Sequence, residues 1–394
     1  MAEKIVFHVD VNSAFLSWTA CDLILNMKAD TDPRTVPAII GGNQATRHGI
    51  VLAKSIPAKK YGIITGEPVI DAKKKCPGLI IYPPDYGLYV KRSREIMELL
   101  KNLTPDVEQY SIDEAFCDFT GFELIYGKPV IFANQLREKI RDELGFTVNI
   151  GVSNNKLLAK MASDFKKPDR VHTLFPREIE EKMWPLPIGN LFFVGASSER
   201  KLKTLGIRTI GDLAHFDPEI LVFHLKAHGM VLWRYANGYD LDIPTDEHIQ
   251  NKGYGNSMTI KFDVDDAETA KHYILSLTEI VTTRIRADGA MISVVSVHIT
   301  DNDFRYHSHQ MTLSAPTDIT EKIYLAACRL FDEMWDHIPI RQLGVHTSRV
   351  TYEGYYQYDL FNGTRIDKLR AVDAAVDDIR SRYGFEYLKR ARFV

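Results

Sequence analysis

Three carboxylates in the sequence occupy positions where charged groups are unusual. Asp10 lies near the end of the apolar run KIVFHVDV, and Asp113 and Glu114 interrupt the apolar stretch YSIDEAFCDF. A charge on such a strand is costly unless it is paired or metal-bound. Carboxylate oxygens suit Mg²⁺, and two such ions about 4 Å apart can activate a hydroxyl and neutralise a leaving phosphate. The alternative is solvated carboxylates at strand ends, which spacing alone favours.

Asp113 and Glu114 are adjacent, and adjacent residues of a regular strand point to opposite faces of its sheet. We therefore expect both to serve one metal site only if they lie at a bend or at the end of a strand.

A second feature is the helix expected to begin at Asn154 or Asn155. An apolar stripe marks its buried side, and Lys156 and Lys160 share another face; the stripe is Leu157, Met161 and Phe165. The positive amino end of this helix, with two lysines in its first turns, could bind phosphate. The alternative is a solvated basic face.

The segment between 34 and 76 is strongly basic and could form a second wall of a phosphate site. Only Glu67 and Asp71 oppose its bases Arg47, Lys54, Lys59, Lys60, Lys73, Lys74 and Lys75. Phe15 follows Asp10 by five residues. Its ring could fill the space that the 2′-hydroxyl of a bound nucleotide needs, or it could be an ordinary core residue.

These residues are distributed over a chain of several parts. Strands alternate with helices up to about residue 172, which favours a layered α/β domain. Prolines 168, 176, 185 and 187 introduce a helix-rich region that ends near Asn237-Gly238 and contains helix–glycine turn–helix patterns. After a polar linker, residues 253–351 read as strand, helix, strand, strand, helix, strand.

The composition is that of an ordinary soluble protein. Its 394 residues suggest roughly two to four domains, and 45% hydrophobic with 26% charged residues excludes disordered and coiled-coil classes. A net charge of −3 requires any nucleic-acid surface to be local. The four cysteines are scattered, which favours a reducing cytosol over disulfides or a zinc site. We find no signal peptide and no apolar segment long enough to span a membrane.

In their order along the chain, these motifs resemble those of the Y-family translesion DNA polymerases. HVDVNSAF is similar to the first metal motif of that family, SIDEA to the second, GVSNNKLLAKMASDFKKP to the nucleotide-binding helix and KLKTLGIRTIGDL to the thumb. The resemblance extends from residue 5 to about 350, and the long string before Pro168 is its most specific part.

The resemblance implies an α+β multidomain fold with the right-hand architecture of polymerases. Its expected parts are a ferredoxin-like palm (1–13 and 77–172), small fingers (14–76), a helix-hairpin-helix thumb (173–238), a linker (239–252), an α+β little finger (253–351) and a tail (352–394). It further implies a template-directed polymerase that transfers nucleotides to a primer 3′-hydroxyl with two Mg²⁺ ions during repair of damaged DNA.

The resemblance also assigns roles to particular residues. Phe15 matches the steric gate against ribonucleotides, and Lys160 would contact the outer phosphates of a deoxynucleoside triphosphate. The implied metal ligands are Asp10, Asp113, Glu114 and the carbonyl of Val11, and the implied nucleotide-binding residues are Ser13, Ala14, Phe15, Lys59 and Lys160.

The fingers depart from the family pattern. Where a tyrosine and an arginine are usual, this chain has Ile56 and Lys59, and Ala53 replaces a threonine. Lysine does not reproduce the bidentate contact of a guanidinium with phosphate. We therefore expect a weaker grip on the triphosphate, offset by Lys54. In the thumb, Ser197 stands where a second glycine is common.

The expected little finger is acidic, with ten basic and fifteen acidic residues between 245 and 350. We therefore expect its DNA binding to be weak and salt-sensitive.

The tail carries a second expected contact. Gln357, Leu360 and Phe361, in the run QYDLF, resemble the pentapeptide that binds bacterial sliding clamps. Tethering to a clamp would raise the effective concentration of the enzyme at a primer end. Beyond this run we expect an amphipathic helix with an apolar stripe at Leu369, Val372, Val376, Ile379 and Tyr383.

The expected partners are primer-template DNA, deoxynucleoside triphosphates and a sliding clamp, with no membrane. We expect a monomer in the cytoplasm, associated with the nucleoid. Two other functions remain open from the sequence: a palm-type nucleotidyl cyclase or phosphotransferase, and a non-catalytic accessory factor tethered to a clamp.

Overall fold

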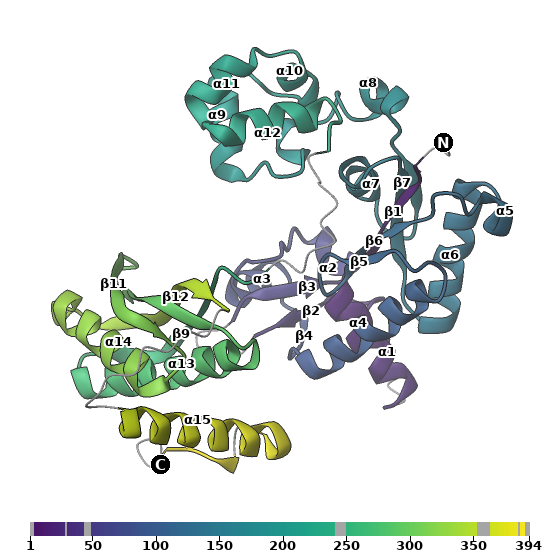
Figure 1. Ribbon diagram of the computed structural model, residues 1–394. Helices are drawn as coiled ribbons and strands as arrows, with labels where there is room; N and C mark the ends of the chain where they lie inside the picture. Colours follow the sequence, from purple (N-terminus) through teal and green to yellow (C-terminus); the bar gives the residue numbers. More distant parts are fainter. Residues whose placement is uncertain are drawn as a thin grey trace. The chain divides into compact units, whose positions relative to one another are not determined.

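A computed structural model describes residues 4–27, 30–42, 49–240, 250–352, 363–384 and 387–390 (Figure 1). The described residues form two compact units, the first ending at residue 240 and the second beginning at residue 250. Arg47, most of the polar linker and the clamp-type run at 357–361 lie outside the described residues.

A five-stranded sheet lies at the centre of the first unit. Its order is β5 (Val107–Gln109), β6 (Glu114–Asp118), β1 (Val6–Val11), β7 (Val148–Ser153) and β8 (Val171–Thr173). Strand β1 is antiparallel to both β6 and β7, and β7 is parallel to β8. Every residue of β1 is buried, as expected for a strand covered on both faces.

The two faces of this sheet are covered by different helices. The odd-numbered residues of β1, such as Phe7, pack with apolar residues of α4 (Tyr86–Lys101) and α6 (Pro129–Leu144). The even-numbered residues face α7 (Lys156–Ser163), where Val6 packs on Ala159. Alternation along the strand therefore places Asp10 on the α7 side.

A smaller sheet and its helices lie mainly in the segment expected to be the fingers (14–76), but β4 (Ile80–Tyr82) comes from the range expected to belong to the palm. The sheet has the order β3 (Val51–Lys54), β2 (Ala38–Gly41), β4, and its own apolar cluster includes Val69 and Ala72 of α3. The helices in and beside this segment are α1 (Ala14–Leu25), α2 (Ile56–Lys60) and α3 (Val69–Lys75).

Short helices make up the rest of the first unit. The predicted helix–glycine turn–helix is present: α9 leads through Gly206, with φ of 84°, to α10, whose cap residue Thr209 accepts a hydrogen bond from Asp212 N–H. These helices are α5 (Glu123–Tyr126), η2 (Pro176–Glu178), α8 (Ile179–Lys182), η3 (Ile188–Asn190), α9 (Ala196–Thr204), α10 (Ile210–Ala214), α11 (Pro218–Leu225) and α12 (Ala227–Ala236).

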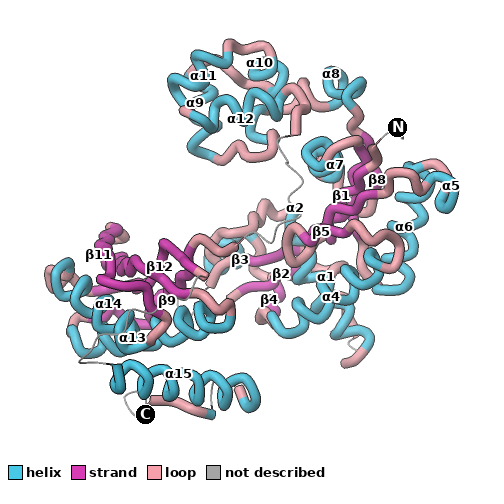
Figure 2. The backbone as a smooth tube through the Cα atoms, in the orientation of Figure 1, coloured by secondary structure: helices cyan, strands magenta, loops and turns pink. Residues whose placement is uncertain are grey.

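The second unit has the predicted order of elements. These are β9 (Gly253–Val264), α13 (Ala267–Ala287), β10 (Met291–Asp301), β11 (Tyr306–Thr317), α14 (Thr320–Met334) and β12 (Ile340–Thr351). The sheet is antiparallel with the order β11-β10-β12-β9. Helices α13 and α14 pack on one face through a shared apolar cluster (Figure 2).

The expected C-terminal helix is present as α15 (Gly363–Tyr383). The prediction that an apolar stripe forms its buried face is wrong. Val372 is 54% and Tyr383 63% exposed, whereas Asp373 and Arg380 are buried. The helix docks on α13 through ion pairs, including Arg380 with Glu279 at 3.0 Å and Arg286 with Asp377 at 2.6 Å. The ion pairs with α13 turn a charged side of α15 toward the rest of the unit, and Val372 and Tyr383 are left exposed.

All four cysteines are free thiols. Among the helices of the described residues, we find none with the length and apolar character needed to cross a bilayer.

Candidate active site

The carboxylates predicted to act together come from two paired strands. Asp10 and Glu114 are direct partners in the antiparallel ladder of β1 and β6, which places their Cα atoms about 4.5–5.5 Å apart. Asp113 lies in the bend before β6, and its carbonyl accepts a 3.0 Å hydrogen bond from Val11 N–H. Adjacent Asp113 and Glu114 were expected to serve one site only at a bend or a strand end. This condition is met, because Asp113 lies in a bend and Glu114 is the first residue of its strand.

Two lysines occupy the immediate surroundings of these carboxylates. Lys167 Nζ lies 2.8 Å from Asp10 Oδ2, and Lys160 Nζ lies 2.8 Å from Glu114 Oε2. Asp113 instead accepts a 2.7 Å hydrogen bond from the Ser111 hydroxyl. In the part of the chain that is described, the three carboxylates therefore do not form a single metal-binding group.

Burial and charge act differently on the two paired carboxylates. Burial raises the pKa of Asp10 to about 7, although the Lys167 ammonium favours its ionised form. Burial also acts to raise the pKa of Glu114, but its contacts with His8 and Lys160 outweigh burial and lower that pKa to about 2. Carboxylates that are buried and held by cations are typical of functional sites.

The donor set has the chemistry of a site for a hard divalent cation, although each carboxylate is paired with a different group of the chain in this structure. It consists of carboxylate oxygens, the ligands that Mg²⁺ prefers. Two ammonium groups already neutralise Asp10 and Glu114, so the pocket stabilises positive charge beside both of them. The ligands implied for two ions are Asp10, Asp113, Glu114 and the Val11 carbonyl.

The start of α1 leaves backbone donors available. Ser13 occupies the cap position with φ of 47°, a left-handed conformation, and its side chain makes no capping hydrogen bond. The Asn12 carbonyl instead accepts from the Ser17 hydroxyl at 2.6 Å. The first N–H groups of a helix have no intrahelical partner, so those of Ala14 and Phe15 suit an anion.

Phe15 lies in an aromatic stack, half-buried at the edge of the core. Its ring is parallel to that of Tyr89, with centroids 4.2 Å apart, and it meets Tyr86 edge-on at 6.1 Å. The sequence left two roles open for Phe15: an ordinary core residue or a steric gate. Its packing fixes the ring while leaving part of it accessible.

The amino end of α7 is already occupied. Asn155 caps the helix, accepting from Leu158 N–H, and Leu157 N–H donates to Asp240 at 3.1 Å. A carboxylate of the chain therefore occupies the place at this helix end where the sequence suggested a phosphate. The helix also ends at Ser163, so Phe165 lies outside it.

The described lysines of the fingers segment lie on β3, α2 and α3. Lys59 is exposed, and Glu67 pairs with Lys75. Burial and the charges of Lys59 and Lys75 lower the pKa of Lys54, while Glu67 acts in the opposite direction. Ile56, which replaces the usual tyrosine, is 53% exposed. Cations that lower the pKa of a neighbouring lysine are a favourable setting for an anion.

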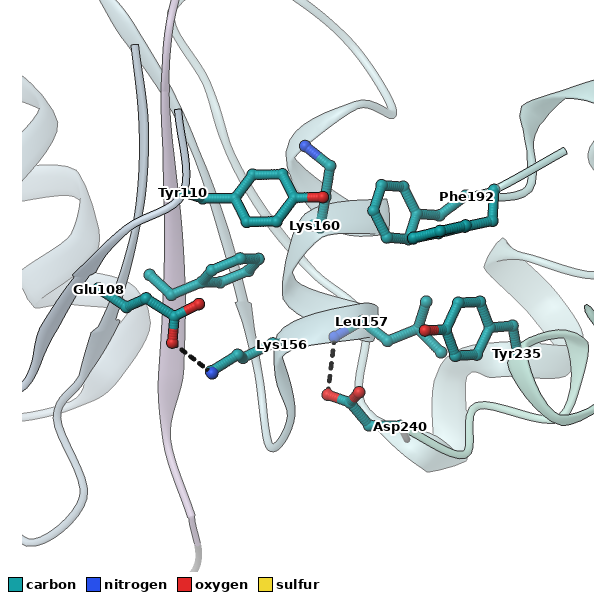
Figure 3. A pocket seen from close by; sticks show the side chains of 10 residues that line it. Glu108, Tyr110, Lys156, Leu157, Lys160, Phe192, Tyr235 and Asp240 are labelled. Atoms are coloured by element: carbon teal, nitrogen blue, oxygen red, sulfur yellow. Dashed lines mark hydrogen bonds and ion pairs between the residues drawn. The ribbon is translucent and has the colours of Figure 1, made fainter. Parts of the chain in front are cut away.

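A cavity of about 220 Å³ lies between the central sheet and the helical region (Figure 3). Lys160 lies between the rings of Tyr110 and Phe192, and Lys156 pairs with Glu108. Phe193 has φ of 70°, which costs about 1–3 kcal/mol for such a residue. The lining residues are Glu108, Tyr110, Phe116, Lys156, Leu157, Lys160, Phe192, Phe193, Tyr235 and Asp240.

Sequence reasoning missed two neighbours of the carboxylates. Lys167 is the second-last residue of the string GVSNNKLLAKMASDFKKP, and only its proximity to a motif could have suggested it. His8 is fully buried, its Nδ1 lies 2.8 Å from Ser163 Oγ and its Nε2 lies 3.8 Å from Glu114. Alternation along β1 could have placed His8 on the same face as Asp10.

Comparison with known proteins shows similarity along the chain. Three family models match: "impB/mucB/samB family" at residues 9–164, "IMS family HHH motif" at 176–207 and "impB/mucB/samB family C-terminal domain" at 251–360. Named relatives include "DNA polymerase IV" of Clostridium acetobutylicum, 45% identical over 98% of each chain. "DNA polymerase IV" of Acetivibrio thermocellus is 36% identical over 98% of this chain and 97% of its own.

The fold has a counterpart among solved structures. A "Y-family DNA polymerase chimera Dbh-Dpo4(243-245)-Dbh" matches with a TM-score of 0.71 at 22% identity, covering 88% of this chain and 99% of its own. At this identity the match supports the multidomain α+β architecture predicted from the sequence.

Proposed function

The chain belongs to the Y family of DNA polymerases, and from that premise we propose how its residues perform the reaction. It is a template-directed DNA polymerase of the translesion type. The observation that carries the residue assignment is the pairing of Asp10 with Glu114 across β1 and β6, with Asp113 in the adjoining bend. Full-length similarity to polymerases favours this activity over a cyclase or an accessory factor.

Y-family DNA polymerases depend on divalent metal ions, and we place two Mg²⁺ ions at Asp10, Asp113, Glu114 and the Val11 carbonyl. When bound, such ions lower the pKa of the primer 3′-hydroxyl and neutralise charge on the triphosphate and pyrophosphate. The contribution of the chain is a buried pocket in which Glu114 stays ionised and Lys167 favours the ionised form of Asp10.

The triphosphate would be held from two sides. On one side are the backbone N–H groups of Ser13, Ala14 and Phe15, supported by the uncapped start of α1. On the other are Lys59 and Lys54 of the fingers segment. A phosphate contact by Lys160 competes with its ion pair to Glu114.

Phe15 would act as the steric gate. Its stacking on Tyr89 restricts the ring to one orientation, and a fixed ring excludes a 2′-hydroxyl better than a freely rotating one. The helical region and the second unit would bind primer-template DNA, and the divisions into palm, fingers, thumb and little finger stay as predicted from the sequence.

We further propose that Gln357, Leu360 and Phe361 bind the sliding clamp, and that the enzyme works as a monomer in the cytoplasm at the nucleoid. These three residues lie outside the described part of the chain, so the proposal is supported by the sequence pattern and by the position of the run after β12.

Primer extension tests the function directly. On undamaged and abasic templates, the protein should extend a primer with deoxynucleotides in Mg²⁺, and a chelator should stop the reaction. Phe15→Ala should raise the ratio of ribonucleotide to deoxynucleotide insertion by about 10- to 100-fold, and Phe15→Tyr should preserve discrimination. No extension by the wild-type protein would refute the function, and unchanged discrimination in Phe15→Ala would refute the gate.

A further inference from the structure

The sheet of the second unit has an open face, opposite the face on which α13 and α14 pack (Figure 2). Val295, Val297 and Leu343 belong to the apolar cluster shared with these helices, so residues at alternate positions point to the open face. Directly paired residues of antiparallel strands share a face. They form four rows across the open face: Thr312, Val294, Ser348 and Gly253; Gln310, Ser296, His346 and Gly255; Ser308, His298, Gly344 and Ser257; Tyr306, Thr300, Gln342 and Thr259.

These rows carry no permanently charged side chain. The second unit has more acidic than basic residues, yet the rows contain no Asp, Glu, Lys or Arg. Carboxylates that would repel a phosphate backbone are therefore absent from these positions, and the hydroxyl and amide side chains there can donate hydrogen bonds. Within the rows, His298 and His346 are the side chains that can gain a charge near neutral pH.

Two glycines allow both imidazoles to lean over the neighbouring strand. A Cβ added to Gly344 would lie 1.9 Å from His298 Cε1, and a Cβ added to Gly255 would lie 2.0 Å from His346 Nδ1. Each ring therefore occupies space that a side chain on the next strand would need. The two imidazole centroids are 4.9 Å apart, and the ring of Tyr306 stacks on His298 at 5.3 Å.

The surroundings of the two rings differ. His298 is 6% exposed, and its Nδ1 has no hydrogen-bond partner among the described residues. Burial and the neighbouring His346 lower the pKa of His298, and no described carboxylate opposes them, so this ring is neutral at about pH 7. His346 is exposed. From α13, Arg284 donates to the Gly255 carbonyl at 3.1 Å and adds a cation beside this row.

We propose that His346, oriented by His298 and Gly255, takes up a proton from solvent when a DNA phosphate binds to the open face, so that the second unit binds primer-template DNA more tightly as the pH falls. This inference rests on the proposed function, which supplies DNA as the ligand of this unit. Without an anion, adjacent imidazoles oppose each other's protonation. A bound phosphate reverses this balance, because the imidazolium donates a charge-assisted hydrogen bond.

The direction of the pH effect follows from linkage. A phosphate raises the pKa of an imidazole that it contacts. The gain in affinity is therefore complete below the pKa of the unbound ring, and it is lost as the pH rises through the pKa of the bound ring. Imidazoles ordinarily titrate at about pH 6.5, so the effect falls between mildly acidic and mildly basic conditions.

The first test is the affinity of the full chain for primer-template DNA at two pH values and constant ionic strength. The ratio of the wild-type affinity to that of His346→Gln should be about tenfold larger at about pH 6 than at about pH 8, since a charged hydrogen bond is lost only at the lower pH. His309→Gln is the matched control, because His309 of β11 points to the helix side and pairs with Glu333 at 3.4 Å. It should bind as the wild type does. A ratio that does not change with pH overturns the proposal.

A permanent charge at the same position gives the converse result. His346→Lys is charged at both pH values, so at about pH 8 it should bind DNA more tightly than the wild type. If it binds no more tightly than the wild type there, position 346 does not meet a phosphate and the proposal is wrong.

The second test counts protons. Binding calorimetry with primer-template DNA, repeated in buffers of different ionisation enthalpy, gives the number of protons that the complex takes up. At about pH 6.5, His346→Gln should take up about half a proton fewer than the wild type. His309→Gln should match the wild type. Equal uptake by the wild type and His346→Gln overturns the proposal.

These readouts are independent of turnover. If the wild type does not extend a primer, the proposed function fails, while proton uptake on DNA binding still decides the role of His346. If primer extension succeeds but proton uptake does not depend on His346, the histidine proposal alone is wrong.

Discussion

At the scale of single residues, the ionisation of a buried carboxylate in this polymerase depends on which groups contact it. Asp10 and Glu114 are partners on adjacent strands. Burial raises the pKa of Asp10 to about 7, whereas contacts with His8 and Lys160 lower the pKa of Glu114 to about 2. The difference arises from neighbours that lie far along the sequence. A local motif shows that carboxylates are present, but not which of them is held ionised.

Lys54 provides a prediction at this scale. Its half-buried position and the nearby charges of Lys59 and Lys75 leave an ammonium that an incoming triphosphate would stabilise. Lys54→Ala should raise the KM for the nucleotide about tenfold, as expected for a lost hydrogen bond to a charged group. Steady-state insertion kinetics measure it. Lys60→Ala, at an exposed position of the same segment, is the control, and an unchanged KM in Lys54→Ala would show that Lys54 does not compensate for the missing arginine.

At the scale of elements, α7 and β7 approach so closely that only glycine fits between them. A Cβ added to Gly151 would lie 1.8 Å from the Ala159 carbonyl oxygen. This contact brings α7, which carries Lys160, close to the sheet that carries Asp10 and Glu114.

Gly151→Ala should therefore lower the free energy of unfolding by about 3 kcal/mol or more, because backbone must move to admit the methyl group. Denaturant unfolding of the full chain measures the loss. Gly78→Ala adds the same methyl group where no atom lies within 4 Å, and it should change stability little. Equal stability of the two variants would contradict the close packing of α7 on β7.

The ion pairs of α15 give a second prediction for an element. The Arg380 and Glu279 side chains are 6% and 3% exposed, and removing one partner leaves a buried charge. Arg380→Ala should cost up to about 3 kcal/mol, because Glu279 keeps an ion pair with Arg390. Arg382→Ala breaks an exposed pair with Asp378 and should cost less than about 1 kcal/mol. If Arg380→Ala and Arg382→Ala have the same melting temperature, the buried ion pair does not hold α15 in place.

The elements also show what sequence patterns can predict. Helix and strand order in residues 253–351 was predictable, since long periodic runs and turn residues define each element. The buried face of α15 was not, because its partners Glu279 and Arg286 lie on α13, remote in the sequence. Asp240 at the start of α7 was missed for the same reason: it lies 83 residues away. Local patterns carry no information on such tertiary partners.

At the scale of the whole molecule, the charge balance favours the proposed tether to a sliding clamp. The second unit has more acidic than basic residues, so its own hold on DNA should weaken steeply with salt. Replacing Gln357, Leu360 and Phe361 together by alanine should abolish stimulation by the sliding clamp while leaving unstimulated extension intact. Extension on a clamp-loaded circular template measures this. Stimulation that persists in the triple variant would remove the clamp proposal.

The central claim is that carboxylates from separate strands form one catalytic centre. Asp113→Asn tests it most directly, because asparagine keeps the shape of the side chain and can still accept from Ser111, while the charge is removed. Primer extension and DNA affinity are measured side by side. The account predicts that extension falls by on the order of a thousandfold while affinity for primer-template DNA is unchanged. Extension near the wild-type rate would contradict it.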